Sequence, residues 1–263
     1  MSCVGSTGRC GRTLTLTSTG SNNTRDGAAD RLLWADGTAR AALGYTAARD
    51  ALDDPRGRVV RCTPWRFTVM LDLPGARVFV KHRGRRPRAG LREWRILHRL
   101  RAAGVPVPEP VFLARSGART ALGTLAVGGR PFDALLAEAS DRNAACRRIV
   151  ELIAPRVARL HAAGYCHRDL YLNHWFADSL EASHVALIDV ERTFRPRLRA
   201  RRFRAKDLAA LLASWPGDGA PATGALRFLR AVHGGELPPR WKRDARWIVA
   251  RARRMRSRRP RHG

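Results

Sequence analysis

Two carboxylates placed twenty residues apart constrain the fold of this chain more than any other feature. The first is Asp169, in a polar segment that begins at His167 and continues to His174. The second is Asp189, which follows the apolar run Val185–Ile188, and such a run predicts a short buried strand. Phosphoryl transfer from a nucleotide needs one carboxylate to orient the attacking hydroxyl and another to hold magnesium against the phosphates. The stretch therefore predicts a loop and a strand that bring Asp169 and Asp189 to one nucleotide.

The segment His167-Arg168-Asp169-Leu170 matches the catalytic-loop signature of protein kinases. The match is incomplete, because protein kinases place Asn five residues after the Asp, where this chain has His174. Its Asn173 lies one position early. No Gly follows Asp189, so the D-F-G element of protein kinases is also absent.

These departures favour a different group of kinases. Three blocks, in this order along the chain, are residues 167–176, 187–192 and 206–214. Together they resemble the lipopolysaccharide core kinases, which phosphorylate heptose or 3-deoxy-octulosonic acid on a lipid-anchored acceptor. The resemblance implies an α+β, bilobal, protein-kinase-like fold with a small antiparallel-sheet lobe and a mostly helical large lobe. It also implies ATP and Mg²⁺ as cofactors, and an anionic glycolipid or sugar as acceptor.

The expected organisation follows from composition and periodicity. Residues 1–28 are rich in Gly, Ser, Thr and Asn and are expected to be disordered. A small nucleotide-binding lobe is expected at 29–128, a large catalytic lobe at 129–250 and a basic tail at 251–263. For residues 30–50 the pattern leaves strand and helix open, so the fold is expected to begin near Arg56.

In the small lobe, the apolar runs predict antiparallel strands at 59–63, 67–71, 77–82, 111–114 and 121–127. Lys81 closes the third run, and in kinase-like folds a Lys in this place braces the nucleotide phosphates. The spacing of residues 90–103 predicts a helix. Its Glu93 would pair with Lys81 as the helix Glu does in kinases, and Glu109 stays an alternative. No glycine-rich loop precedes Lys81, because residues 62–66 occupy the first turn.

Residues 128–131 are expected to form the hinge, so backbone groups from Leu125 to Val127 would face the adenine. Helices are expected at 132–138 and, as one continuous element, at 144–163. Asp207 is expected to open a further helix and to accept backbone N–H groups. A last helix is expected after Pro238.

The candidate catalytic residues are Asp169, His167 and Arg168. Asp169 would orient the acceptor hydroxyl, and Arg168 would brace the loop. Asp189 and His174 are the candidate metal residues, although imidazole is a poor magnesium ligand and His174 is equally compatible with a packed histidine. Arg192 would either neutralise phosphate or belong to the basic face that follows it.

The net charge of +28 indicates polyanionic partners. Anionic lipid headgroups, phosphorylated glycolipid and nucleic acid all qualify, and a basic surface without a dedicated partner is the plain alternative. Trp241 and Trp247 lie among basic residues, as at a membrane surface or a nucleic-acid interface. A nucleic-acid-binding protein on a kinase scaffold is disfavoured, because no dedicated nucleic-acid motif is present and both acids are intact.

The five cysteines are scattered, so the sequence predicts neither a disulfide framework nor a zinc site. No apolar run is long enough to cross a bilayer, so no membrane span is predicted. The expected location is cytoplasmic, with peripheral contact at the inner face of the inner membrane.

Overall fold

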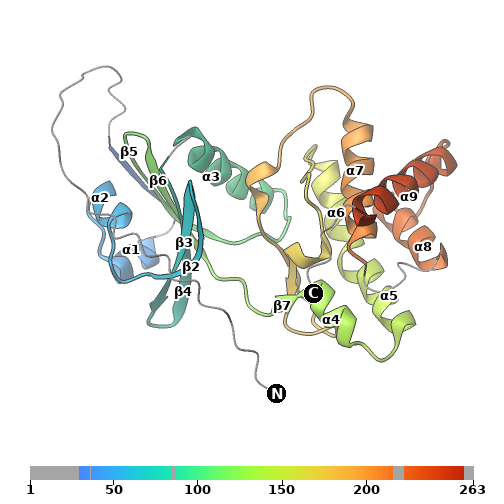
Figure 1. Cartoon of the computed structure of the whole chain (residues 1–263), viewed down its shortest axis with the longest axis horizontal. Coiled ribbons are helices and arrows are strands. Elements are labelled where there is room, and N and C mark those ends of the chain that lie inside the picture. The colour runs from blue at the N-terminus through green and yellow to red at the C-terminus, as the bar shows by residue number, and fades with distance from the viewer. Residues whose placement is uncertain (1–29, 36, 85–86, 216–221, 258–263) are drawn as a thin grey trace.

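The chain folds into two lobes (Figure 1), and the computed structural model describes residues 30–35, 37–84, 87–215 and 222–257. The small lobe contains a six-stranded antiparallel sheet in the order β1-β5-β6-β4-β3-β2. Its strands are β1 (Arg31–Trp34), β2 (Arg58–Thr63), β3 (Arg66–Leu73), β4 (Ala76–Arg83), β5 (Pro110–Ser116) and β6 (Arg119–Leu125). All five strands predicted in this lobe are present.

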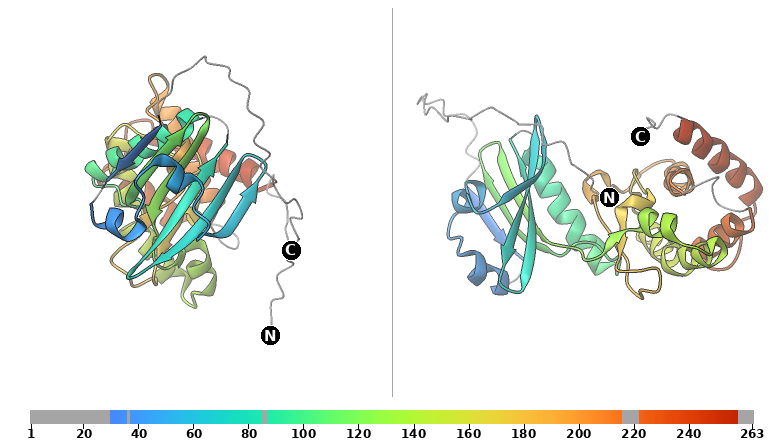
Figure 2. Two further views of the ribbon diagram at one scale, coloured as in Figure 1. Left: turned by 90° about the vertical axis from the view of Figure 1, so that its left-hand side faces the viewer. Right: turned by 60° about the horizontal axis from the view of Figure 1, so that its bottom comes forward.

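Helices cover both faces of this sheet, because consecutive residues of β5 and β6 are buried and successive side chains of a strand point to opposite faces. Helices α1 (Gly37–Leu43) and α2 (Ala48–Leu52) belong to one side, where Leu52 shares a core with Phe112 of β5. Helix α3 (Pro87–Ala102) covers the other side, where Leu97 shares a core with Leu113 of β5. This second face looks toward the large lobe (Figure 2).

The expectation that the fold begins near Arg56 is wrong. Strand β1 pairs with β5 in register from Arg31, opposite Arg115, to Trp34, opposite Phe112. The ring of Trp34 also lies 5.7 Å from that of Phe112, centroid to centroid. Four residues carry too little periodicity to identify a strand by themselves, and the neighbour that stabilises this one lies almost 80 positions later.

The large lobe is mainly helical. Its helices are α4 (Phe132–Glu138), α5 (Arg142–Leu152), α6 (Ala154–Ala162), α7 (Ala200–Ala213), α8 (Ala222–Val232) and α9 (Trp241–Ser257). A small antiparallel sheet of β7 (Arg130–Pro131), β8 (Trp175–Ala177) and β9 (Ala186–Leu187) faces the small lobe, together with the short 3₁₀ turns η1 (Leu172–His174) and η2 (Val190–Arg192).

Two helix predictions need correction. The helix expected at 144–163 is divided into α5 and α6. Pro155 lies in the first turn of α6, and proline lacks the N–H that a continuous helix would need there. Asp207 does not open a helix but lies inside α7, where it is fully buried.

At the C-terminus, residues 251–257 of the predicted tail continue α9, whereas 258–263 lie outside the described residues. The segment 1–28, predicted to be disordered, also lies outside them. Within the part of the chain that the structure describes, no helix has both the length and the apolar composition that a membrane crossing requires.

The connection between the lobes depends on one glycine. Gly129 has φ of +83°, and a Cβ atom there would lie 2.3 Å from the backbone carbonyl of Ala177 in β8. Any other residue would meet both conformational strain and a clash. Glycine at 129 therefore lets the chain leave the small lobe and pack closely against β8.

Candidate active site

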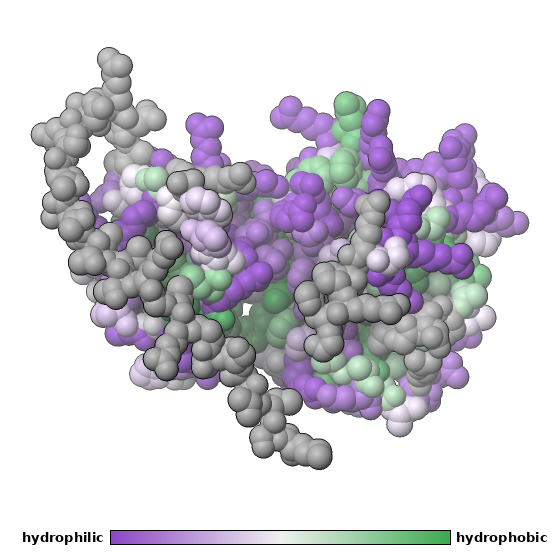
Figure 3. Space-filling model, viewed as in Figure 1, coloured by the Kyte–Doolittle hydropathy of each residue, from purple (hydrophilic) through white to green (hydrophobic). Residues whose placement is uncertain are grey.

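A cleft of about 620 Å³ lies between the two lobes. In Figure 3 the molecule is hollowed between the lobes, with hydrophobic residues deep in the hollow and hydrophilic residues around it. This space is called the lobe cleft below. It brings together every residue that the sequence predicted for nucleotide or metal binding, namely Lys81, Glu93, Leu125, Val127, His174 and Asp189.

Lys81 connects the two lobes electrostatically. It lies on β4, opposite Leu122 of β6, and its Nζ donates to Oε1 of Glu93 at 2.7 Å. The same Nζ lies 3.8 Å from Oδ1 of Asp189 in the large lobe. The alternative partner Glu109 accepts instead from Arg101 at the surface, at 2.9 Å. The pairing of Lys81 with Glu93 is therefore as predicted.

Glu93 is almost completely buried, with 2% of its side chain exposed. Burial by itself raises the pKa of this carboxyl group, but the positive charges of Lys81 and Arg83 outweigh burial and lower its pKa below the usual value. Glu93 is therefore held in the ionised form, which fixes the position of the Lys81 ammonium.

Two arginines and Glu191 extend this network, and the sequence analysis gave them no role. Arg83 donates to Glu93 and, at 3.0 Å, to Oε2 of Glu191. Arg66 of β3 donates to the same oxygen of Glu191 at 2.5 Å. The role of Arg83 could have been predicted from its spacing, because it follows Lys81 by two residues on a strand and so lies on the same face of the sheet.

The backbone and side chain of Asp189 are both unusual. Its φ and ψ of 56° and 49° are left-handed, a region in which a non-glycine residue is strained. The Oδ1 atom is buried and accepts no hydrogen bond from any described residue. A carboxylate oxygen in this state is a strong ligand for a hard divalent cation.

Asp169 is held from two sides. Its carboxylate accepts from Nη1 of Arg192, with distances of 3.0 and 2.8 Å to Oδ1 and Oδ2. Its backbone carbonyl lies 2.7 Å from Nδ1 of His174, whose ring lines the lobe cleft. Asn173 lines the lobe cleft as well, although the sequence analysis gave it no function. Asp169 thus lies between the lobe cleft and Arg192.

The backbone before Asp169 is fixed by the buried carboxylate of Asp207. Oδ2 of Asp207 accepts from the backbone N–H of His167 at 2.9 Å, and Oδ1 accepts from that of Arg168 at 2.8 Å. Nε2 of His161 lies 3.1 Å from the same Oδ2. The prediction that Asp207 accepts backbone N–H groups is confirmed. These bonds hold Arg168 in a left-handed conformation with φ of 76°.

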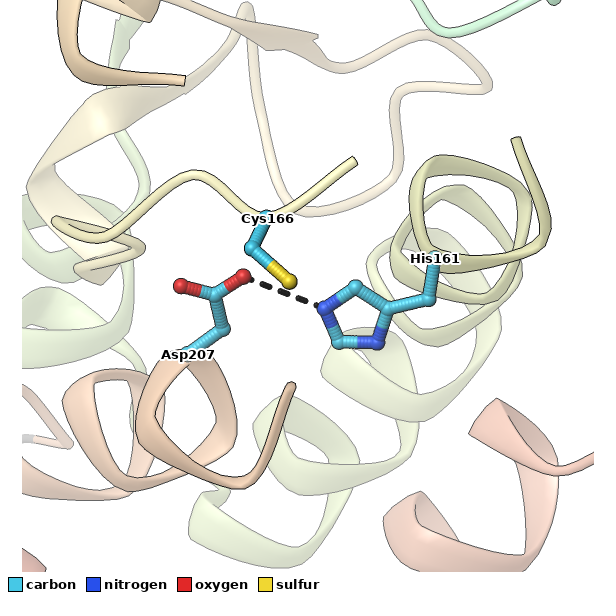
Figure 4. A group of neighbouring side chains, drawn as sticks. All are labelled: His161, Cys166 and Asp207. Carbon is cyan, nitrogen blue, oxygen red and sulfur yellow. Dashed lines mark hydrogen bonds and ion pairs between the residues drawn. The ribbon is translucent and has the colours of Figure 1, made fainter. Parts of the chain in front are cut away.

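His161, Cys166 and Asp207 lie close enough to hold a metal ion, with candidate ligand atoms within 4.8 Å of one another (Figure 4). However, the carboxylate of Asp207 is already used by hydrogen bonds. Burial, and then the charge of Asp207, raises the pKa of the Cys166 thiol to about 12, whereas metals bind the thiolate. The arrangement fits a structural support for the loop better than a metal site.

His167 is fully buried, and its Nε2 lies 3.2 Å from the carbonyl of Ile188 in the strand segment before Asp189. Burial lowers its pKa, so the imidazole is neutral at pH 7. Neither Asp169 nor His167 lines the lobe cleft or the cleft beside it. Asp169 has 24% of its side chain exposed, whereas His167, which was predicted among the catalytic residues, is fully buried. Its contacts link the Asp169 loop to the Asp189 segment, which is a positioning role.

The second cleft, of about 680 Å³, lies beside the first. This space, called the arginine cleft below, is lined by Trp65, Ala89 and six charged residues. The charged residues are five arginines and one acid, namely Arg66, Arg83, Arg92, Arg168, Arg192 and Glu191. Arg66 also lines the lobe cleft, so the two spaces adjoin.

Comparisons with known proteins relate the chain to a family of kinases. Residues 77–231 match the family described as "Lipopolysaccharide kinase (Kdo/WaaP) family". The lipopolysaccharide core heptose(I) kinase WaaP of Pseudomonas aeruginosa is 28% identical over 246 residues, which cover 81% of this chain and 92% of that protein. WaaP of Escherichia coli is 28% identical over 211 residues, which cover 69% of this chain and 80% of its own length.

Solved structures give the same picture of the fold. A structure described as "WaaP in complex with acyl carrier protein" has a TM-score of 0.69 at 27% identity and covers 86% of this chain and 98% of its own. An aminoglycoside-3'-phosphotransferase of type VIII has a TM-score of 0.53 at 19% identity and covers 78% of this chain and 98% of its own. The second likeness concerns the fold alone.

Proposed function

Because this chain belongs to the lipopolysaccharide kinase (Kdo/WaaP) family, we propose that it transfers the terminal phosphate of ATP to a sugar hydroxyl of a lipopolysaccharide-core glycolipid. The observation that carries the proposal is the position of Lys81. Its ammonium joins Glu93 of the small lobe and Asp189 of the large lobe inside one cleft. This arrangement suits a nucleotide triphosphate held between the lobes.

The nucleotide base would lie at the start of the hinge. The backbone N–H of Leu125 donates to the backbone carbonyl of Glu109 at 2.8 Å, and that of Ala126 donates to the backbone carbonyl of Arg77 at 2.7 Å. Leu125, Ala126 and Val127 all line the lobe cleft. Since the first two amides are used within the fold, the amide of Val127 is the group we assign to the adenine edge.

The donor set of the lobe cleft fits a magnesium ion. Asp189 would hold it, because its buried Oδ1 has no hydrogen-bond donor among the described residues. Asn173, with an amide oxygen on the same wall, is a better second ligand than the imidazole of His174. When bound, the ion supplies positive charge against the phosphates.

In the transfer step, Lys81 would bind the phosphates, while Asp169 would accept the hydrogen bond of the attacking hydroxyl and direct it in line. Arg192, already bonded to Asp169, would place positive charge beside the acceptor. Asp207 and His167 would not touch the substrate, but would hold the loop that carries Asp169 from its buried side.

Phosphorylation of another hydroxylated acceptor, including a protein, is the nearest alternative within the same chemistry. The likeness to an aminoglycoside phosphotransferase concerns the fold alone and does not favour an antibiotic acceptor. The net charge of +28 suits an acceptor presented at an anionic membrane surface.

The proposal is tested with purified protein, ATP, magnesium and deacylated core oligosaccharide, by mass spectrometry of the sugar. Wild-type protein should add one phosphate, and Asp169→Asn should add none while binding ATP as tightly. Asp244→Asn, which removes a carboxylate paired with Arg201 on the far helices, should leave the transfer unchanged. If wild-type protein leaves the oligosaccharide unmodified but phosphorylates another acceptor, the acceptor assignment fails and the reaction class stands.

A further inference from the structure

The arginine cleft has a large excess of positive charge for its size. Of the six charged residues that line it, five are arginines and only Glu191 is acidic. Glu191 is already paired with Arg66 and Arg83. Within the described residues, neither Arg92 nor Arg168 has a carboxylate within 4 Å. The cleft is therefore suited to binding an anion from outside the protein.

The free hydrogen-bonding capacity points the same way. Nη2 of Arg92 donates to the carbonyl of Thr193 at 2.8 Å, which places its guanidinium at the cleft. Nε of Arg168 is buried and has no acceptor among the described residues. Arg92 and Arg168 thus both bring to the cleft a guanidinium group that no carboxylate of the described residues neutralises.

The position of this cleft limits what the anion can be part of. Arg192 lines it, and the same guanidinium contacts Asp169 at 2.8 Å. Through the side chain of Arg192, the cleft is therefore connected to the carboxylate that would orient the acceptor hydroxyl. An anionic group bound there and a hydroxyl at Asp169 would lie on the same sugar or on adjacent sugars.

We propose that the arginine cleft is an acceptor subsite, in which Arg92, Arg168 and Arg192 bind a phosphate or carboxylate group next to the hydroxyl that is phosphorylated. This subsite rests on the proposed sugar-kinase function and restricts it, because it requires an acceptor with an anionic group close to the reacting hydroxyl. Guanidinium groups suit it, since their planar donors match phosphate and carboxylate oxygens in pairs.

Binding without ATP tests the subsite independently of turnover. The probes are deacylated core oligosaccharide, the same oligosaccharide after dephosphorylation and carboxyl reduction, and inorganic phosphate, each measured by calorimetry. Wild-type protein should bind the intact oligosaccharide at least about tenfold more tightly than the neutral form. Equal affinity for the two forms would overturn the proposal, and so would inorganic phosphate binding as tightly as the intact oligosaccharide, because the ligand would then be free phosphate.

Variants of two arginines on helix α3 distinguish binding at a specific subsite from a general effect of the positive surface charge. Arg92→Ala should abolish the preference for the intact oligosaccharide, and Arg92→Lys, which keeps the charge but not the paired donors, should reduce it. Arg99→Ala, on the same helix but outside the cleft, should keep the preference. Equal losses in Arg92→Ala and Arg99→Ala would show a non-specific charge effect and overturn the subsite.

Steady-state kinetics distinguishes the proposed acceptor subsite from the proposed sugar-kinase function on which it rests. Arg92→Ala should raise the KM for intact acceptor by about ten- to a hundredfold and leave the KM for ATP unchanged. If wild-type protein phosphorylates both forms with the same KM, the subsite fails and the kinase function stands. If it phosphorylates neither form but binds the intact one through Arg92, the acceptor function fails and the anion site stands.

Discussion

Replacing Asp207 by Asn tests whether this buried carboxylate holds the loop that carries Asp169. The two oxygens of Asp207 accept the backbone N–H groups of His167 and Arg168 at 2.9 and 2.8 Å. An Asn side chain has one acceptor oxygen, so one of these N–H groups would face an amide NH₂ instead. Leaving a buried donor without an acceptor costs about 1–3 kcal/mol, and the other bond also loses its charge assistance. We therefore expect a loss of about 2–4 kcal/mol in the free energy of unfolding.

Urea unfolding measures this loss, and steady-state kinetics measures its effect on the site. We expect kcat to fall more than about tenfold, because Arg168 relaxes from its left-handed conformation and Asp169 moves with it. The KM for ATP should change little, since Lys81 and Asp189 are untouched. Asp244→Asn is the matched control, because its bond to Arg201 is a surface ion pair worth at most about 1 kcal/mol. An unfolding free energy of Asp207→Asn within about 0.5 kcal/mol of the wild-type value would refute the reasoning.

Three further predictions address the hinge, the buried ion pair and the phosphate site. Gly129→Ala should lower the free energy of unfolding, measured in urea, by more than about 2 kcal/mol. Gly75→Ala, with a similar φ but nothing within 4 Å of the new Cβ atom, should lower it by about 1 kcal/mol. Equal losses would contradict the close approach of the backbone at residue 129. Burial raises the pKa of Glu93, but the paired cations favour its charged form and lower the pKa below 4.5. The ionised carboxylate therefore stabilises the fold above pH 4.5, and this stabilisation is lost as the pH falls below that value. Glu93→Gln should thus be less stable at pH 7 and lose less stability than wild type between about pH 5 and 3, and parallel acid-unfolding curves would contradict this. Lys81→Met should lower kcat/KM for ATP by at least about a hundredfold, and a smaller loss would show that the ammonium does not bind phosphate.

Much of the candidate site was predictable because phosphoryl transfer requires particular residue types at spacings that seldom arise in other kinds of protein. Lys81 in a predicted strand and Glu93 on the following helix could be paired from the sequence. Asp169 and Asp189 stand out because each lies in a recognisable local pattern. These predictions depend on two kinds of local signal. Strand and helix periodicity places the residues, and the resemblance to kinase motifs implies their roles.

The rest depends on contacts between distant segments, which no local pattern records. Glu191 pairs with Arg66, which is 125 positions away in the chain, and β1 is a strand only because β5 lies beside it. The division between α5 and α6 was missed for a different reason, since the apolar stripe continues across Pro155 although the backbone hydrogen bonds do not. The arginine cleft was concealed in a chain with 50 basic residues, where no single arginine stands out.

The central claim is that Asp189 and Lys81 meet at one magnesium-bound nucleotide, and a binding measurement tests it most directly. ATP affinity is measured by calorimetry for wild-type protein and for Asp189→Asn, each with magnesium and with EDTA. The account predicts that magnesium strengthens ATP binding to the wild-type protein by at least about tenfold and has little effect on the variant. An equal effect of magnesium on both proteins would contradict it, because the ion would then be bound without Asp189.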